Sequence, residues 1–122
     1  MDATIGSLQR GIDKGEGTTL NIPLGEGTPA RTHREAFRDA LNAIEKGFPP
    51  DLIIISAGFD SRRDDPLGGL LLEDSDFAEM TKEVMGMAER TAGGRVASVL
   101  EGGYNLDTLG ETVRTYVAAL TS

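Results

Sequence analysis

The sequence has 122 residues, of which 39% are hydrophobic and 26% charged, with 16 glycines and no cysteine. This composition is typical of one globular domain with many tight loops, and it excludes disulfides and thiolate metal sites. The formal net charge of -8 argues against nucleic-acid binding and fits either simple solubility or a field that favours a cationic substrate.

The N-terminal stretch MDATIGSLQR has no basic region followed by an apolar one, so no signal peptide is predicted. No apolar run approaches the roughly 20 residues that a membrane-spanning helix needs. We therefore expect a cytoplasmic protein with no membrane partner. Residues 1–16 lack clear periodicity and are expected to be loosely ordered, within a single α/β domain over residues 1–122.

The first βα unit is predicted to open with a strand from Thr18 to Ile22, followed by a loop rich in Pro and Gly. A helix should start at Thr32, whose spacing to Glu35 fits a capping box. Gly47 fits the C-terminal cap of that helix, and the prolines that follow it prevent continuation.

The second unit contains the clearest strand, Asp51 to Ser56, a continuous apolar run that is typical of a strand buried on both faces of a parallel sheet. Helices are therefore expected on both sides of it. A long loop should run from Ala57 to about Asp74, and a helix from Ser75 to Arg90 should follow, ended by Gly93 and Gly94.

The third unit is predicted to comprise a strand from Arg95 to Leu100, the loop Glu101 to Asn105, and a helix opened by Thr108 with Glu111. Alternating strands and helices predict an α/β fold of three layers around a parallel sheet, with about three strands and three helices. Ligand sites of such sheets lie at the carboxyl ends of the strands.

Two predicted loops at that edge carry candidate chemistry. The first has three carboxylates, those of Asp60, Asp64 and Asp65, which either bind a divalent cation or are solvated and cap a helix. The second contains Gly102-Gly103 and Tyr104. The glycines permit either close approach of a ligand or a tight turn, and the tyrosine is either a site residue or a packing residue.

The only histidine, His33, follows the predicted helix start and is expected to be exposed to solvent. It is not a candidate site residue.

Three motifs in register resemble the histone deacetylase and acetylpolyamine amidohydrolase family. They are Pro50 to Asp60 (PDLIIISAGFD), Asp65 to Gly68 (DPLG) and Leu100 to Leu106 (LEGGYNL), preceded by Asn21 to Leu24 (NIPL). The resemblance runs from about Gly17 to Leu120. It implies part of an arginase/deacetylase-like fold, namely the C-terminal third of a larger deacetylase domain.

The resemblance implies roles for four residues. Members of the family bind one zinc ion and hydrolyse acetamides. Asp65 falls on a zinc aspartate, and Tyr104 on the tyrosine that hydrogen-bonds the scissile carbonyl. Gly102 and Gly103 fall on glycines that line the acyl end of the substrate channel. The substrate would be acetyl-lysine, an acetylpolyamine or a related acetylated amine.

Other elements of the family site have no counterpart in this sequence. The second zinc aspartate, the zinc histidine and the catalytic histidine pair lie upstream in the family, and His33 falls away from the site. Zinc is therefore expected in the complete enzyme, whereas tight binding by this chain alone is not, and the isolated chain is expected to be inactive. A small sheet with open edges also predicts a homo-oligomer or pairing with a complementing segment.

Two other classes of function stay open. The chain could be a noncatalytic α/β assembly module or inactive remnant, which zinc content and turnover would distinguish from an enzyme segment. A nucleotide-binding module using the Gly102-Gly103 turn is less favoured, because neither G-x-G-x-x-G nor a P-loop pattern is present.

Overall fold

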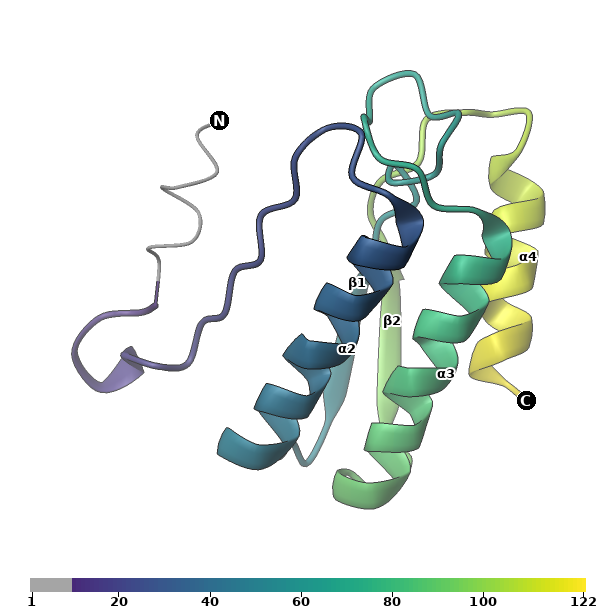
Figure 1. Cartoon of the computed structure of the whole chain (residues 1–122). Coiled ribbons are helices and arrows are strands. Elements are labelled where there is room, and N and C mark those ends of the chain that lie inside the picture. The colour runs from purple at the N-terminus through teal and green to yellow at the C-terminus, as the bar shows by residue number, and fades with distance from the viewer. Residues whose placement is uncertain (1–9) are drawn as a thin grey trace.

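The computed structural model describes residues 10–122 and shows an α/β arrangement (Figure 1). A short 3-10 helix, η1 (Asp13–Gly15), precedes the long helix α2 (Ala30–Gly47). Strand β1 (Ile53–Ala57) is followed by helix α3 (Asp74–Thr91), and strand β2 (Val96–Leu100) by helix α4 (Leu109–Leu120). The α/β class, the parallel sheet and the three long helices are confirmed.

Strands β1 and β2 are parallel neighbours, with Ile55 opposite Ser98 at the centre of the register. Hydrogen bonds between the two chain segments continue past the strand ends, since Glu101 N donates to Ala57 O at 2.9 Å and Phe59 N to Gly102 O at 2.8 Å. The carboxyl ends of both strands therefore stay side by side as they become loops. This places the two predicted site loops at one edge of the sheet.

Helix α3 begins and ends at signals in the sequence. Glu73 and Asp76 form a reciprocal capping box, in which each carboxylate accepts a backbone N–H of the other residue. At the other end, Gly94 N donates to Ala88 O at 2.9 Å, and both Gly93 and Gly94 have positive φ angles, 60° and 76°. The capping box starts the helix at Asp74, one residue before the predicted start.

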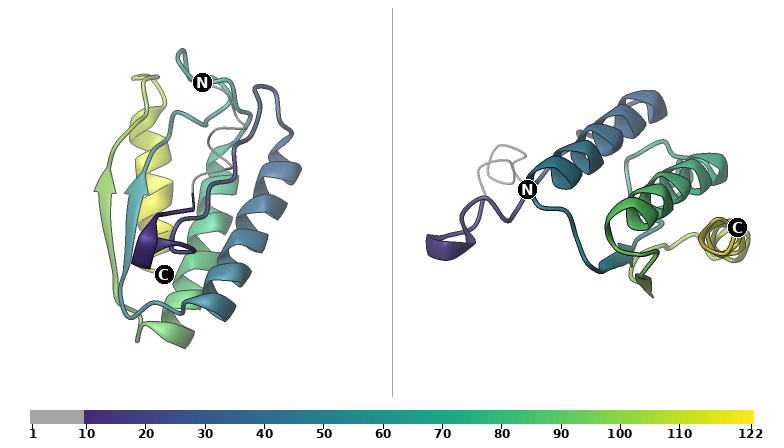
Figure 2. Two further views of the ribbon diagram at one scale, coloured as in Figure 1. Left: turned by 90° about the vertical axis from the view of Figure 1, so that its left-hand side faces the viewer. Right: turned by 90° about the horizontal axis from the view of Figure 1, so that it is seen from below.

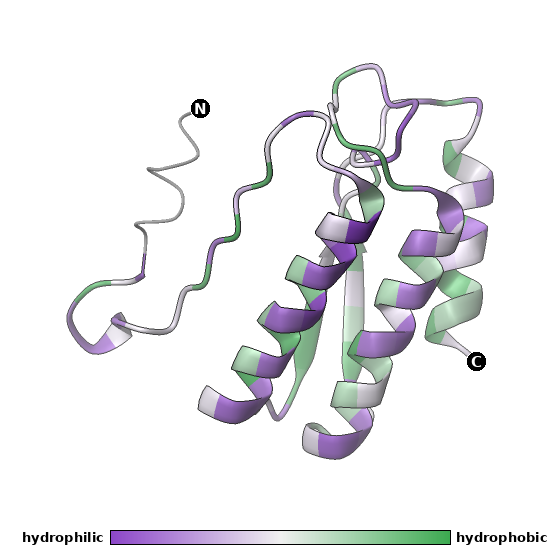
Figure 3. Ribbon diagram, in the orientation of Figure 1, coloured by the Kyte–Doolittle hydropathy of each residue, from purple (hydrophilic) through white to green (hydrophobic). Residues whose placement is uncertain are grey.

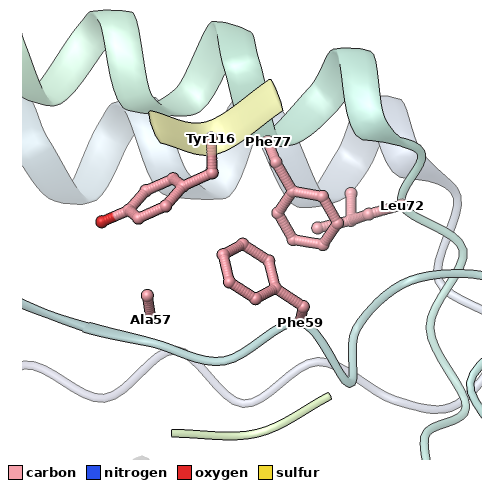
Figure 4. Close-up of a cluster of buried hydrophobic side chains, with 5 residues drawn as sticks. All are labelled: Ala57, Phe59, Leu72, Phe77 and Tyr116. Carbon is pink, nitrogen blue, oxygen red and sulfur yellow. The ribbon is translucent and has the colours of Figure 1, made fainter. Parts of the chain in front are cut away.

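The core is an aromatic cluster on the side of the sheet that the helices cover (Figure 4). The ring of Phe59 lies edge-on to those of Phe77 in α3 and Tyr116 in α4, with centroids 5.2 Å apart in each pair. Leu72 in the loop before α3 is fully buried beside them. Ala57 at the end of β1 completes the cluster.

The predicted first strand, Thr18 to Ile22, is not formed. Its residues have no strand assignment, and Figure 1 shows the segment running apart from β1 and β2. A strand forms only where a neighbouring strand pairs with its backbone. The β-branched residues of this segment favour an extended conformation but do not provide that neighbour. Of the predicted loosely ordered residues 1–16, residues 1–9 lie outside the described residues, and η1 occupies part of the rest.

The expectation that helices cover β1 on both sides is also wrong for the part of the chain that the structure describes. The helices lie on one side of the two strands (Figure 2). On the opposite face, Ile54 is 67% exposed and Val99 57% exposed. Figure 3 shows apolar strands behind helices whose outer surfaces are mainly polar. The run of isoleucines indicates a doubly buried strand, but only half of that burial is present.

Helix α2 starts earlier than predicted. Its first residue is Ala30, with Pro29 at the N-cap and no side-chain cap, so Thr32 and Glu35 form no capping box. Glu35 instead accepts a hydrogen bond from Arg31 one turn before it, at 3.1 Å. The carbonyl of Pro29 accepts the N–H of His33 at 3.1 Å, the first hydrogen bond of the helix, and the proline fixes φ at -58°.

Candidate functional site

The candidate site consists of two loops at the carboxyl edge of the sheet, one between β1 and α3 and the other between β2 and α4. The first loop is held in shape by its own backbone: Leu72 N donates to Ser61 O at 3.0 Å, and Arg63 N donates to Leu72 O at 2.9 Å. Leu72 is fully buried, so its packing fixes the start of α3 relative to the acidic stretch. The fold thus holds the predicted carboxylates beside the second loop.

Asp65 connects the two loops. Its Oδ2 atom accepts the backbone N–H of Tyr104 at 2.7 Å, across 39 positions of sequence. Its Oδ1 atom accepts the N–H groups of Leu67 and Gly68 at 2.8 and 3.0 Å. The side chain is buried, with Asp65 only 7% exposed. The structure therefore brings two of the predicted site residues into direct contact.

These contacts determine the ionisation of Asp65. Burial raises the pKa of the carboxyl, but the backbone N–H donors that contact it outweigh burial and hold the pKa below its ordinary value. Asp65 is consequently a carboxylate at neutral pH. Besides the three hydrogen bonds above, the backbone N–H of Asn105 also contributes to this lowering.

A zinc ion does not fit the described residues by themselves. Catalytic zinc needs three protein ligands, and no group of three His, Asp or Glu side chains that could hold a metal lies within residues 10–122. Asp65 has the chemistry of one ligand, namely a buried carboxylate that is ionised at neutral pH. The remaining ligands of any zinc site would come from outside these residues.

The two glycines of the second loop have structural reasons to be glycine. Gly103 has a φ of 136°, which side chains rarely permit, and a Cβ there would lie 2.7 Å from Leu109 Cδ1. A Cβ on Gly102 would lie 3.0 Å from the Asp60 carboxylate. Close packing within the chain thus accounts for both glycines, and the substrate-channel role implied by the resemblance stays a prediction.

Tyr104 is not a packing residue. It is 47% exposed at the edge of the sheet, whereas the other tyrosine, Tyr116, is buried in the core. The hydroxyl groups of Tyr116 and Ser98 are 2.6 Å apart and share a hydrogen bond. The phenol of Tyr104 is consequently accessible to a ligand, while that of Tyr116 serves the fold.

The other two loop carboxylates, Asp60 and Asp64, have different surroundings, and that of Asp60 lies beside Gly102. Asp64 pairs with Arg62, which also donates to Asp74 Oδ1 at 3.0 Å. Asp74 accepts a second hydrogen bond from the hydroxyl of Thr112 in α4, at 2.6 Å. This network links the first loop to α3 and α4. Asp64 thus has an ion-pair role within the fold.

His33 is half-buried, which contradicts the prediction of an exposed histidine. It lines an apolar hollow of about 270 Å³ between α2, β1 and α3, together with Phe37 and Met80. Its Nδ1 atom is buried, and no partner for it lies in the described part of the chain. Burial lowers the pKa of His33, opposed by the negative charge of Asp76. Because α2 begins at Ala30, His33 lies on the inner face of its first turn.

Asn105 is a site residue that the sequence reasoning did not identify. Its Nδ2 atom donates to the backbone carbonyl of Asp64 at 3.0 Å, and its Oδ1 atom accepts the N–H of Asp107 at 3.1 Å. We give the name loop clasp to two of the contacts between the loops, Asn105 to Asp64 and Tyr104 N–H to Asp65. An Asn shortly before a helix start was the available signal, since it often turns the chain there.

Fold and site define an α/β protein with a loop site at the carboxyl edge of a parallel sheet, of the arginase/deacetylase type. Residues 4–120 match the family model described as the histone deacetylase domain. The chain therefore belongs to the histone deacetylase family.

Relatives in sequence and structure agree with this assignment. The chain is 38% identical over 110 residues to histone deacetylase 14, chloroplastic, of Arabidopsis thaliana, and 42% identical over 101 residues to a histone deacetylase-like amidohydrolase of Pseudomonas aeruginosa. These alignments cover 90% and 82% of this chain and 26% of each relative. The chain thus spans about a quarter of the length of these relatives.

A solved structure gives the same picture of the fold. Acetylpolyamine aminohydrolase from Burkholderia pseudomallei aligns with a TM-score of 0.81 at 28% identity, over 93% of this chain and 31% of that one. None of the helices in residues 10–122 is long and apolar enough to cross a membrane.

Proposed function

We propose that this chain is the C-terminal part of a zinc-dependent deacetylase domain, in which it supplies the tyrosine side of the active site. The observation that carries the proposal is the 2.7 Å hydrogen bond between Tyr104 N and Asp65, which holds two motif loops together at the edge where such sheets bind ligands. The substrate is an acetylated amine, such as acetyl-lysine or an acetylpolyamine, and the location is cytoplasmic. The net charge of -8 suits a cationic substrate.

In this proposal each of the four predicted residues has a separate task. Asp65, kept ionised by its backbone donors, provides one zinc ligand, and the other ligands come from outside the described residues. The Tyr104 hydroxyl donates a hydrogen bond to the oxyanion that develops on the acetamide carbonyl. Gly102 and Gly103 leave room beside it for the acyl group. The chain alone binds zinc weakly and does not turn over substrate.

The test compares the two tyrosines in an enzyme completed by the remaining family segment. Tyr104→Phe should lower turnover by roughly 100- to 1000-fold and leave substrate affinity nearly unchanged, because the lost hydrogen bond is stronger in the transition state. Tyr116→Phe is the matched control, since it removes a hydroxyl bonded to Ser98 in the core. A Tyr104→Phe enzyme that keeps a third of its turnover overturns the catalytic role.

A second candidate, a noncatalytic assembly module, is favoured by the open sheet face, where Ile54 is 67% exposed. In that case the apolar face binds a second copy or a complementing segment, and the loop site has no chemical task. The completed protein distinguishes the two proposals: an assembly module forms a stable complex without zinc uptake or turnover of an acetyl-lysine peptide.

A further inference from the structure

The side chain of Asn105 makes two hydrogen bonds that differ in what they join. Its Oδ1 atom accepts the N–H of Asp107 at 3.1 Å, a local contact that shapes the turn before α4. Its Nδ2 atom donates to the carbonyl of Asp64 at 3.0 Å, a contact across 41 positions of sequence. Only the second bond ties the Tyr104 loop to the acidic loop.

The position of the Tyr104 phenol depends on its backbone. The side chain is 47% exposed and lies outside the aromatic core cluster, so little packing holds the ring. The backbone is held on both sides of the Cα atom: the Tyr104 N–H contacts Asp65 at 2.7 Å, and the next residue, Asn105, contacts Asp64 at 3.0 Å. Two anchors flanking one residue restrict the rotation of its backbone and thereby the direction of its side chain.

The second anchor does not depend on any residue proposed to bind metal. Asp64 contributes its backbone carbonyl, while its carboxylate pairs with Arg62. The backbone of Asn105 is fixed separately, because its carbonyl accepts the N–H groups of Thr108 and Leu109 at 3.2 and 3.0 Å. Replacing the Asn105 side chain therefore removes the contact with the Asp64 carbonyl, while the Tyr104 N–H contact with Asp65 and the start of α4 stay in place.

We propose that Asn105 is a positioning residue, which directs the Tyr104 hydroxyl by tying the Tyr104 loop to the Asp64 carbonyl. The inference rests on the proposed function of Tyr104, but the contact itself is a property of this chain. Both contacts of the loop clasp are made by residues of this chain.

The experiment uses the whole 122-residue chain, labelled with 3-fluorotyrosine, because the sequence contains only two tyrosines. Tyr104 reports the site loop and Tyr116 reports the core. Asn105→Asp keeps an acceptor for the Asp107 N–H but turns an oxygen toward the Asp64 carbonyl. Asn105→Ser is the neutral second variant, too short to reach that carbonyl. Leu106→Ala, an exposed change in the same loop, is the control.

Both Asn105 variants should move the Tyr104 fluorine resonance toward its position in the urea-unfolded chain and leave the Tyr116 resonance in place. Exchange of the Tyr104 amide hydrogen should become about three- to tenfold faster, as expected for losing one net hydrogen bond. Leu106→Ala should change neither signal. Rescue of the wild-type Tyr104 signal by Asn105→Gln, which restores the amide donor on a longer arm, would support the assignment further.

Two results overturn the proposal: an unchanged Tyr104 signal in both variants, or equal shifts of both tyrosines in both variants, which would indicate a general role in stability. If Asn105→Asp alone shifts the resonances of both tyrosines, the added charge has a general effect, and the result for Asn105→Ser decides: a shift of the Tyr104 resonance alone supports the proposal, and no shift overturns it. The proposed function is tested by a different measurement, the turnover of the completed Tyr104→Phe enzyme. If that enzyme keeps its turnover, the proposed function fails, while the fluorine and amide-exchange results on the 122-residue chain still decide the role of Asn105.

Discussion

The two faces of the sheet differ in how completely this chain covers them. On one face, Phe59 is 4% exposed and packs edge-on against rings from α3 and α4. On the other, Ile54 of β1 and Val99 of β2 lie largely in solvent. The first face has a core of its own. The second has the composition of a core without anything that covers it among the described residues.

This difference separates what the fold can do alone from what it needs a partner for. The loop site lies at the strand ends, and its contacts come from the loops and the covered face. A strand pair with one face packed against helices and the other exposed to solvent can therefore hold the site loops in order while it still exposes an apolar surface. We expect stability to depend on the covered face and assembly on the open one.

The largest expected effect is on the covered face. Phe59→Ala should lower the free energy of unfolding by about 3–5 kcal/mol, because the cavity removes contacts with both Phe77 and Tyr116. Such a loss is a large part of the total stability of a small domain. Ile54→Ala is the matched control and should cost less than about 1 kcal/mol. Urea unfolding followed by circular dichroism measures both, and equal costs would remove the distinction between the faces.

The next effect concerns the open face. We predict that the chain self-associates through it, and that Ile54→Lys together with Val99→Lys weakens association at least tenfold, or about 1.4 kcal/mol. Buried ammonium groups without partners are costly in such a contact. Leu67→Lys is the control, an equally exposed apolar residue in the site loop. Sedimentation equilibrium provides the measurement, and a wild-type chain that stays monomeric at high micromolar concentration contradicts the prediction.

The sequence predicted the local elements well where the signals were local. Helix α3 was expected from Ser75 to Arg90 and runs from Asp74 to Thr91, because a cap and two glycines set its ends. The placement of Asp65 and Tyr104 at one sheet edge followed from parallel topology. These predictions depend on short-range chemistry and on one general rule of α/β sheets.

The features that the sequence did not predict depend on contacts between residues far apart in the chain. Whether Thr18 to Ile22 becomes a strand is decided by a neighbour, and its composition does not specify one. The burial of the His33 side chain depends on where α2 starts and on what α2 packs against. The contact between Asn105 and Asp64 crosses 41 positions and uses a backbone carbonyl, which every residue has. No sequence pattern distinguishes such an acceptor.

A smaller effect should appear with pH. The pKa of Asp65 is lowered in the fold, so its contribution to stability is complete above its ordinary pKa of about 3.9 and is lost as the pH falls through the folded value. The Asp65→Asn variant should be less stable than wild type at pH 7, and the difference should shrink below about pH 4. Glu45 and Asp64 also have lowered pKa values, but they titrate in both proteins. A difference that is constant from pH 7 to pH 3 contradicts this assignment.

The smallest effect is expected where α2 joins the covered face. Helix α2 has no fully buried residue, and its contacts with α3 include two ion pairs, Arg38 with Glu83 and Arg90 with Glu45, each at 2.9 Å. The Arg90 guanidinium donates to both oxygens of Glu45, a paired geometry that fixes the distance between the helices.

Exposed pairs of this kind contribute little, because water screens the charges and two long side chains must be ordered. A double-mutant cycle with Arg90→Gln and Glu45→Gln should therefore give a small favourable coupling at low salt that falls close to zero in 1 M NaCl. The pair Lys82 and Glu79, which lies within α3, is the control for general salt effects on helices. A coupling energy that persists in high salt would mean that α2 is held by packing around the pair, and that the covered face extends further across α2 than the exposure of its side chains indicates.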